Sequence, residues 1–328
     1  MFGSKTDKKL DVTALGELLV DFTPLGCSEA GMRIFEQNPG GAPANVLAAL
    51  SKWGRKTGFL GKVGGDMHGA FLKETLKACG VGIEGLIEDE HVFTTLAFVK
   101  LGADGERQFS FARKPGADTC LRPEELWDDY LKLTTIFHFG SLSLTDEPAR
   151  SATLLAVRKA KKSGAVISYD PNYRRLLWPG EEAAVCGMRL GLELADLVKL
   201  SEEESLLLTG EDNPSKAMAV LLRQGTKAAA ITLGSKGAIV GNHEGMCLVP
   251  GIAAQAVDTT GAGDTFWAGV LDRLLAAGLG KTRPLAEISL DELALAARYG
   301  NAAASLCVEK HGGIPAMPEQ AAVIRRMQ

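Results

Sequence analysis

Apolar runs of strand type alternate with amphipathic helical runs along almost the whole 328-residue chain. The strand-type runs lie at 12–21, 57–61, 94–100, 108–112, 135–139, 166–170, 197–200, 228–233 and 238–241. The helical runs lie at 43–53, 68–79, 149–162, 181–194, 215–224, 264–277 and 291–308. A strand followed by a helix and another strand favours a parallel sheet with helices on both faces. We therefore predict an α/β fold on a central, mostly parallel sheet, with ligands beyond the carboxyl ends of its strands.

One segment departs from this alternation. The runs 94–100 and 108–112 are joined by Gly102-Ala103-Asp104-Gly105, with no helix between them. Two strand runs joined by a short glycine-containing turn predict a β-hairpin. Together with part of 18–36, this hairpin is expected to form a small separate sheet beside the ligand cleft, where it would act as a lid.

The remaining chain gives no reason to divide it into sequential domains. A hydrophobic content of 46% supports a substantial core. We expect one domain over 10–328, with lid segments at about 18–36 and 93–114 inserted in it. Residues 1–9 are polar and basic without an apolar signal region, and they are expected to form a disordered tail.

The net charge and the spacing of the cysteines and histidines argue against several kinds of binding partner and metal site. A net charge of −4 argues against an electrostatic nucleic-acid partner. No apolar run reaches the length of about 18 residues that a membrane span needs. The six cysteines form no C-x-x-C pair, and the five histidines show no metal-ligand spacing. We therefore expect a cytoplasmic protein that binds small molecules, without a structural zinc site.

The segment Asp258-Thr259-Thr260-Gly261-Ala262-Gly263-Asp264 opens a helical run and is the strongest chemical signal in the chain. Its glycines leave backbone N–H groups uncovered, and the first N–H groups of a helix have no partner within it. Such a turn binds anions. A carboxylate at Asp264 fits this site if it takes a proton from a hydroxyl that attacks a phosphoryl group. An ordinary helix cap is the structural alternative for Asp264.

A second glycine turn, Asn38-Pro39-Gly40-Gly41-Ala42-Pro43-Ala44-Asn45, also opens a helix. Pro43 suits a first helical turn, where its missing N–H costs nothing. Asn45 can both donate and accept hydrogen bonds, as recognition of a polyol requires. The alternative is an exposed asparagine on a helix.

Two polar segments follow buried strand runs. Ser168–Arg175 contains Arg174, which could anchor an anionic or hydroxyl-rich ligand, or belong to a solvated loop. In the acidic run 201–204, Glu204 could orient the water ligands of Mg²⁺, or belong to a solvated helix N-terminus. Gly80-x-Gly82-x-x-Gly85 follows a helix rather than a strand, so we reject it as a dinucleotide fingerprint.

These motifs together resemble the ribokinase-like (PfkB) family of carbohydrate kinases, and within it the fructokinases most. Both family signatures are present, at 40–65 and 258–271, and the resemblance extends from about Leu10 to the end of the chain. Further resembling segments lie at 16–22, 39–45, 137–141, 169–178 and 312–316. The resemblance implies a ribokinase-like fold with a small β-sheet lid. It also implies transfer of phosphate from ATP to D-fructose, giving D-fructose 6-phosphate, with Mg²⁺ and K⁺ as candidate ions.

The same resemblance implies roles for individual residues. Asp264 would be the catalytic base, and the backbone of Gly261, Ala262 and Gly263 would form the anion hole. The implied sugar-binding residues are Asp21, Gly40, Gly41, Asn45, Arg113 and Arg174. The implied nucleotide-binding residues are Lys199, Thr232, Gly234, Gly237 and Asn301. Glu204 would act at Mg²⁺, and Asp258 and Thr260 at a monovalent cation.

Two departures from the family leave the substrate open. The Asn-x-x-Glu motif of the family is Ser201-x-x-Glu204 here, and the Phe-Tyr-Arg of many fructokinases is Phe111-Ala112-Arg113. A kinase for 2-keto-3-deoxygluconate, ribose or a nucleoside is the nearer alternative. A non-catalytic sugar-binding member is the more distant one. Homodimerisation through the small sheet is the common habit of the family.

Overall fold

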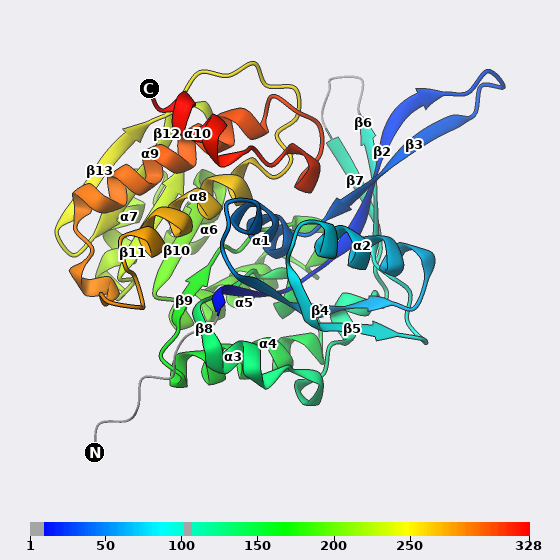
Figure 1. The fold of residues 1–328 in the computed structure, drawn as a ribbon, viewed down its shortest axis with the longest axis horizontal. Coiled ribbons are helices and arrows are strands. Elements are labelled where there is room, and N and C mark those ends of the chain that lie inside the picture. The colour runs from blue at the N-terminus through cyan, green and yellow to red at the C-terminus, as the bar shows by residue number, and fades with distance from the viewer. Residues whose placement is uncertain (1–9, 102–106) are drawn as a thin grey trace.

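The protein contains one large central sheet and a smaller sheet beside it (Figure 1). The computed structural model describes residues 10–101 and 107–328. The expected tail over 1–9 and the expected hairpin turn over 102–105 lie outside the described residues. Within the described ranges, no helix is both long enough and apolar enough to cross a membrane.

The large sheet is mostly parallel, as predicted. Its strands are β1 (Leu10–Leu15), β4 (Thr57–Gly64), β5 (Gly82–Asp89), β8 (Thr134–Phe139), β9 (Val166–Tyr169), β10 (Leu197–Ser201), β11 (Ala228–Thr232), β12 (Gly237–Asn242) and β13 (Gly245–Pro250). Their order is β13-β12-β11-β10-β9-β8-β1-β4-β5. All neighbours from β11 to β5 pair in parallel, whereas β12 and β13 are antiparallel. The carboxyl ends of the parallel strands therefore meet at one edge.

The small sheet is also confirmed. It contains β2 (Leu19–Cys27), β3 (Arg33–Gly40), β6 (Leu96–Leu101) and β7 (Arg107–Ala112) in the order β3-β2-β6-β7. The expected hairpin is β6–β7, and it joins the sheet through a parallel pairing of β6 with β2. The β2–β3 hairpin extends away from the rest of the protein (Figure 1).

The prediction of one strand over 12–21 was wrong. The chain leaves the large sheet at Leu15 and enters the small sheet at Leu19. A Cβ at Gly16 would lie 2.6 Å from Cγ of Pro43, so glycine allows the chain to pass close to the next helix at this break. Because nearly all residues on both sides of the break are apolar, the hydrophobic pattern did not show it.

Ten α-helices cover the two faces of the large sheet in the described ranges. They are α1 (Ala42–Lys52), α2 (Met67–Ala78), α3 (Asp128–Leu133), α4 (Ala149–Lys162), α5 (Glu181–Leu194), α6 (Glu202–Thr209), α7 (Pro214–Arg223), α8 (Ala262–Ala276), α9 (Leu290–Cys307) and α10 (Gln320–Arg326). All seven predicted helices are confirmed to within two residues at each end. The short helices α3, α6 and α10 and the strands β5 and β13 were not predicted.

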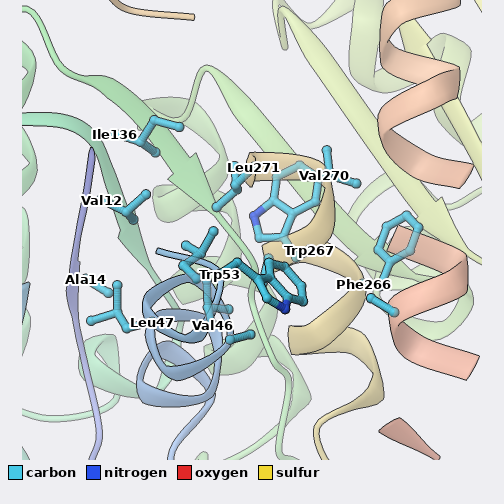
Figure 2. Packing of buried hydrophobic residues seen from close by; sticks show 14 of the residues in the cluster. Val12, Ala14, Val46, Leu47, Trp53, Ile136, Phe266, Trp267, Val270 and Leu271 are labelled. Atoms are coloured by element: carbon cyan, nitrogen blue, oxygen red, sulfur yellow. The ribbon is translucent and has the colours of Figure 1, made fainter. Parts of the chain in front are cut away.

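Separate hydrophobic clusters lie on the two faces of the large sheet. One contains side chains of α1, α2, α8, α9 and α10, and the other contains side chains of α3 to α7. In the first cluster, Trp267 of α8 packs near Val46 of α1 and near Trp53, which directly follows α1 (Figure 2). Trp267 is fully buried, and its indole N–H donates to Ser168 Oγ at 2.8 Å. Because Trp267 lies one helical turn after Asp264, this packing fixes the beginning of α8.

Candidate active site

A cavity of about 400 Å³ lies where the carboxyl ends of the central strands meet the small sheet. Its walls come from the small sheet, the beginning of α1, the segments after β1, β8 and β9, and the beginning of α8. The lining residues are Glu17, Leu19, Asp21, Thr23, Asn38, Gly41, Ala42, Asn45, Val99, Phe111, Leu142, Asn172, Arg174, Asp258, Thr259, Thr260, Gly261, Gly263, Asp264, Gly312 and Gly313. The cavity thus occupies the position expected for ligands of this sheet type.

Asp264 lies in the first turn of α8 with its carboxylate at the cavity wall. The side-chain amide of Asn45 donates to Oδ2 at 2.8 Å, and that of Asn172 donates to Oδ1 at 3.3 Å. Gly261, in the left-handed region at φ 75°, occupies the cap position, so the cap interpretation of Asp264 is wrong. The buried carboxylate is held from both sides by amide donors that leave further lone pairs for a ligand.

The glycine turn before Asp264 presents backbone N–H groups to the cavity. The N–H of Ala262 donates to Thr259 O at 3.2 Å, so it closes the turn. Gly263 and Asp264 line the cavity, and their N–H groups belong to the first helical turn, which has no acceptors within the helix. A Cβ at Gly263 would lie 2.9 Å from Lys199 Nζ, so a side chain here would press on that ammonium.

Asp21, Gly41 and Asn45 also line the cavity. A Cβ at Gly40 would lie 2.3 Å from Asp21 Oδ2, so the absence of a side chain there makes room for this carboxylate. Gly41 has φ 123°, a conformation that L side chains rarely adopt. Asn45 is buried, not exposed. The structure therefore brings three of the predicted sugar-binding residues to one cavity with Asp264.

The two predicted arginines have different surroundings. Arg174 lines the cavity and is exposed, and its guanidinium donates to Tyr173 O at 3.0 Å and Asn172 Oδ1 at 3.4 Å. Arg113 does not line the cavity in this structure. It is buried in an ion pair with Asp118, which attracts the guanidinium away from the ligand space.

A buried charge cluster lies beneath the beginning of α8. Lys199 Nζ lies 2.9 Å from Asp170 Oδ2. Burial alone would lower the pKa of Lys199, but Asp170, Glu204 and Asp264 attract the proton and raise this pKa above its usual value. Burial is the largest influence on the pKa of Asp170, which it raises. Lys199 therefore serves as the counter-ion of several buried carboxylates in this structure.

Glu204 caps its own helix from a buried position. Its Oε2 accepts from Ser201 N–H at 2.7 Å, and its Oε1 accepts from Tyr173 N–H at 2.8 Å. Among the described residues, no group of three or more His, Cys, Asp or Glu side chains is arranged to hold a metal ion. A Mg²⁺ at this position would therefore need phosphate oxygens and water as its other ligands, which is the usual habit of this ion beside phosphates.

Asp258 and Thr260 lie together at the end of the cavity near Gly312. Asp258 Oδ1 accepts from Thr260 N–H at 2.8 Å, and Oδ2 accepts from Gly312 N–H at 3.0 Å. These bonds tie the glycine turn of α8 to the C-terminal segment. Oxygen ligands of this kind suit a hard cation, and the assignment of a monovalent ion here stays a prediction.

The other predicted nucleotide-binding residues lie around the β11–β12 connection and are not among the cavity-lining residues. Thr232 ends β11, and Gly234 and Gly237 have φ 58° and 103° in the turn that follows. Asn301 of α9 donates to Val249 O at 3.2 Å and Pro250 O at 3.0 Å. The structure thus groups these residues beside β13, and their contact with a nucleotide stays a prediction.

Asn172 and Glu17 are two of the cavity-lining residues that were not predicted from the sequence. Asn172 adopts a positive φ of 50° after Pro171, and its amide contacts Asp264. Asparagine tolerates this conformation better than most residues, so the segment Asp170-Pro171-Asn172 could have indicated a sharp turn that directs Asn172 to the site. Glu17 lines the cavity, and its Oε1 accepts from Ala42 N–H at 2.8 Å. The only sequence feature that pointed to Glu17 was the presence of an acidic residue within an apolar run.

Substituting Glu17 with glutamine is expected to remove part of the pH dependence of stability. Burial raises the pKa of Glu17 in the folded protein to about 7, above its ordinary value of 4.5. The folded protein therefore retains a proton that the unfolded chain releases, and the parent loses stability as pH rises through this window. Relative to the parent, Glu17→Gln should gain up to about 3 kcal/mol of unfolding free energy between about pH 4.5 and pH 7.

Urea unfolding across this pH range measures the effect. Glu124→Gln is the matched control because Glu124 is exposed. Its difference from the parent should stay constant with pH. A constant difference for Glu17→Gln as well would show that Glu17 does not carry the buried proton.

Comparisons with known proteins identify a matching family, similar sequences and similar structures. The sequence model of a family described as "pfkB family carbohydrate kinase" matches residues 9–320. Fructokinase-2 of Oryza sativa subsp. japonica is 42% identical over 310 residues, which cover 94% of this chain and 90% of that protein. A fructokinase of Xylella fastidiosa with bound ATP has a TM-score of 0.89 and 32% identity, with 97% of this chain and 98% of that chain covered.

A further solved structure is a fructokinase double mutant of Vibrio cholerae O395, described with fructose, ADP and potassium ion bound. It has a TM-score of 0.86 and 30% sequence identity, with 98% of this chain and 100% of that chain covered. These similarities extend over both the large and the small sheet of the present chain.

Proposed function

Because this chain belongs to the pfkB family of carbohydrate kinases and is a sugar kinase, we propose that it transfers a phosphoryl group from ATP to D-fructose, giving D-fructose 6-phosphate. The fructokinases named above support fructose as the substrate. The single observation that carries the chemistry is the carboxylate of Asp264, held by Asn45 and Asn172 at the beginning of α8 inside the cavity.

In the proposed mechanism, Asp264 acts as the general base. A hydroxyl of the sugar gives its proton to the carboxylate, and its oxygen forms a bond to the γ-phosphorus of ATP. The bond from that phosphorus to the β-phosphate oxygen breaks, which releases ADP. Negative charge on the transferred group is stabilised by the N–H groups of Gly263 and Asp264 and by the positive end of the α8 dipole. Ala262 contributes to this anion hole by closing its turn.

The sugar and the ions are assigned to the predicted residues. Asp21, Asn45 and the backbone at Gly40 and Gly41 would hold the sugar hydroxyls. Glu204 would act at Mg²⁺, which neutralises phosphate charge when it is bound. Asp258 and Thr260 would serve a K⁺ ion, supported by the potassium named with the Vibrio cholerae fructokinase.

We assign the whole range 10–328 to one kinase domain, with the small sheet as its lid. The small sheet supplies Leu19, Asp21, Val99 and Phe111 to the cavity. Its closure over the sugar would exclude water and limit wasteful hydrolysis of ATP. A fragment that lacked the lid segments and still phosphorylated the sugar with parental efficiency would contradict this assignment.

A second candidate substrate is supported by Arg174. Its exposed guanidinium at the cavity would attract a carboxylate, such as that of 2-keto-3-deoxygluconate. The mechanism at Asp264 would be the same, and only the sugar would differ.

The first experiment measures ADP release with MgATP on fructose, ribose, 2-keto-3-deoxygluconate, glucose and adenosine. Turnover on fructose above all others supports the proposal. Preferential turnover on 2-keto-3-deoxygluconate favours the second candidate and keeps the mechanism. Sugar binding without turnover on any of the five would overturn the proposed reaction.

We also propose that two copies pair through their small sheets. Leu25 (67% exposed), Met32 (69%), Ile34 (41%) and Phe98 (39%) place apolar side chains on this sheet and its hairpin. Phe98 also contacts Phe35 of the same sheet, with 6.1 Å between their ring centroids, and exposed apolar side chains that lie together are typical of an interaction site. Sedimentation velocity should give a dimer for the parent and a monomer for Ile34→Lys. A monomeric parent at micromolar concentration would contradict the pairing.

All six cysteines are unpaired, which fits a reducing compartment, and we propose a cytoplasmic location. Cell fractionation tests it, since recovery of the protein outside the cytoplasm would contradict the proposal.

A further inference from the structure

Both arms of the β6–β7 hairpin are held by a single carboxylate. Thr95 directly precedes β6, and its hydroxyl donates to Asp118 Oδ1 at 2.5 Å. Arg113 directly follows β7, and its Nε and Nη2 lie 2.8 Å and 2.7 Å from Asp118 Oδ2. Each oxygen of Asp118 therefore binds one end of the same hairpin. We call Thr95, Arg113 and Asp118 the clamp.

The clamp is fixed to the body of the protein. Asp118 lies in a short 3-10 helix, Ala117–Cys120, which packs against β4 of the large sheet. The N–H of Ala117 also donates to Phe93 O at 2.9 Å, on the chain that leads into the hairpin. A Cβ at Gly116 would lie 1.8 Å from Thr95 Oγ1 and 2.9 Å from Asp118 Oδ1. Glycine at this position therefore leaves the space in which the Thr95–Asp118 bond forms.

The clamp is closed to water. Thr95, Arg113 and Asp118 are 1%, 7% and 5% exposed. Burial opposes the charge on Arg113, but Asp118, together with Glu17 and Asp146, more than offsets this and raises the pKa of the guanidinium. Breaking a buried ion pair from one side leaves the other charge without compensation. The clamp is therefore expected to hold one geometry, unlike an exposed ion pair.

The clamp also borders the cavity. Arg113 Nη2 donates to Leu142 O at 2.9 Å, and Leu142 lines the cavity. Val99 of β6 and Phe111 of β7 line the cavity from the hairpin itself. Beyond the clamp, the described part of the hairpin pairs with the rest of the small sheet through the short β2–β6 register that starts at Val20 and Leu96. Asp118 is therefore one of two places that set the angle of the hairpin over the cavity, and the pairing of β6 with β2 is the other.

We propose that Asp118 is a positioning residue for sugar phosphorylation, which sets the pivot of the β6–β7 hairpin by holding Thr95 and Arg113 together. This inference rests on the proposed function of the cavity. Asp118 acts through the hairpin and contacts no reacting atom. It also gives a physical role to Arg113, which the family resemblance would have directed to the sugar.

Asp118→Asn tests the clamp with little change of volume. The amide can still accept from Thr95, but it cannot neutralise Arg113, so the hairpin loses its fixed pivot. kcat/KM for the sugar should fall by about 10²-fold, mainly through KM for the sugar, because small misplacements of a binding wall have effects of this size. KM for ATP should change by less than about twofold. Release of ADP without sugar should rise relative to release with sugar.

Two further variants keep the test decisive. Asp272→Asn is the matched control, because Asp272 is fully buried and pairs with Arg55 at 2.6 Å near the far end of α8. It should lose stability without changing the ratio of sugar-free to sugar-dependent ADP release. Thr95→Val removes one hydroxyl and keeps the ion pair, so it decides the question if Asp118→Asn does not fold. It should raise KM for the sugar several-fold.

The clamp proposal would be overturned if a folded Asp118→Asn or Thr95→Val protein had the parental KM for the sugar and the parental ratio of sugar-free to sugar-dependent ADP release. The proposed kinase function would not be affected by this result. A parent without sugar-dependent ADP release would instead overturn the proposed function. In that case the clamp is tested by amide hydrogen exchange. Exchange in β6 and β7 should be faster in Asp118→Asn than in Asp272→Asn, and equal rates would contradict the clamp.

Discussion

Replacing Asp264 with asparagine is expected to lower kcat for sugar phosphorylation by about 10²–10⁴-fold, because an amide cannot accept the proton of the attacking hydroxyl. The side chain keeps its shape and position at the beginning of α8. However, the carboxylate accepts from the amides of both Asn45 and Asn172. An amide at 264 has one acceptor oxygen, so one of the two neighbouring amides must rotate. We therefore expect a modest change in sugar affinity beside the large loss of turnover.

Steady-state ADP release and calorimetric sugar binding separate these effects. Asp291→Asn is the matched control, because Asp291 is an exposed carboxylate in the first turn of α9. It makes the same change of charge near a helix N-terminus without touching the cavity, so its kcat should equal that of the parent. An Asp264→Asn protein that retains more than about a tenth of parental kcat would remove Asp264 from the role of base.

Gly41→Ala is expected to have the second-largest effect, on stability and on sugar binding together. Gly41 has φ 123°, and a Cβ there would lie 2.3 Å from the backbone oxygen of Glu17. The alanine must strain its own backbone and displace that oxygen, which we expect to cost about 3 kcal/mol of unfolding free energy. Because Gly41 and Glu17 both line the cavity, KM for the sugar should rise as well.

Gly54→Ala separates backbone strain from the steric clash. Gly54 has φ 83°, and nothing lies within 4 Å of the position that its Cβ would take. It should lose only about 1 kcal/mol and keep the parental KM for the sugar. Urea unfolding and sugar titration measure both variants. Equal losses of stability in the two, with unchanged KM, would contradict the role assigned to the Gly41–Glu17 contact.

The long elements could be predicted from the sequence because each has its own local signal. The helices α4 and α5 have the predicted bounds, since their apolar residues recur at helical spacing and polar segments flank them. The exit from the large sheet near Gly16 could not be predicted in the same way. It depends on the contact with Pro43, which only the folded chain contains.

Several residues of the cavity were predicted individually, but their assembly was not. Asp264 and Asn45 are 219 residues apart, and only the order of the strands brings them within 2.8 Å. The role of Arg113 could not be predicted from its residue type, because an arginine can either bind a ligand or form an ion pair. Asp118, which decides between them, gave no sequence signal of its own. Choices of this kind depend on which charges the fold buries together.

The cavity wall also has a consequence for the synthesis of the chain. Its residues extend from Glu17 to Gly313, which are far apart along the chain. Asp258 binds the N–H of Gly312, so the last wall closes only when the C-terminal segment docks on the glycine turn of α8. A ribosome must therefore release the chain through Gly313 before the cavity is complete. A truncated translation product ending before Gly312 would keep Asp264 but have a cavity open on one side.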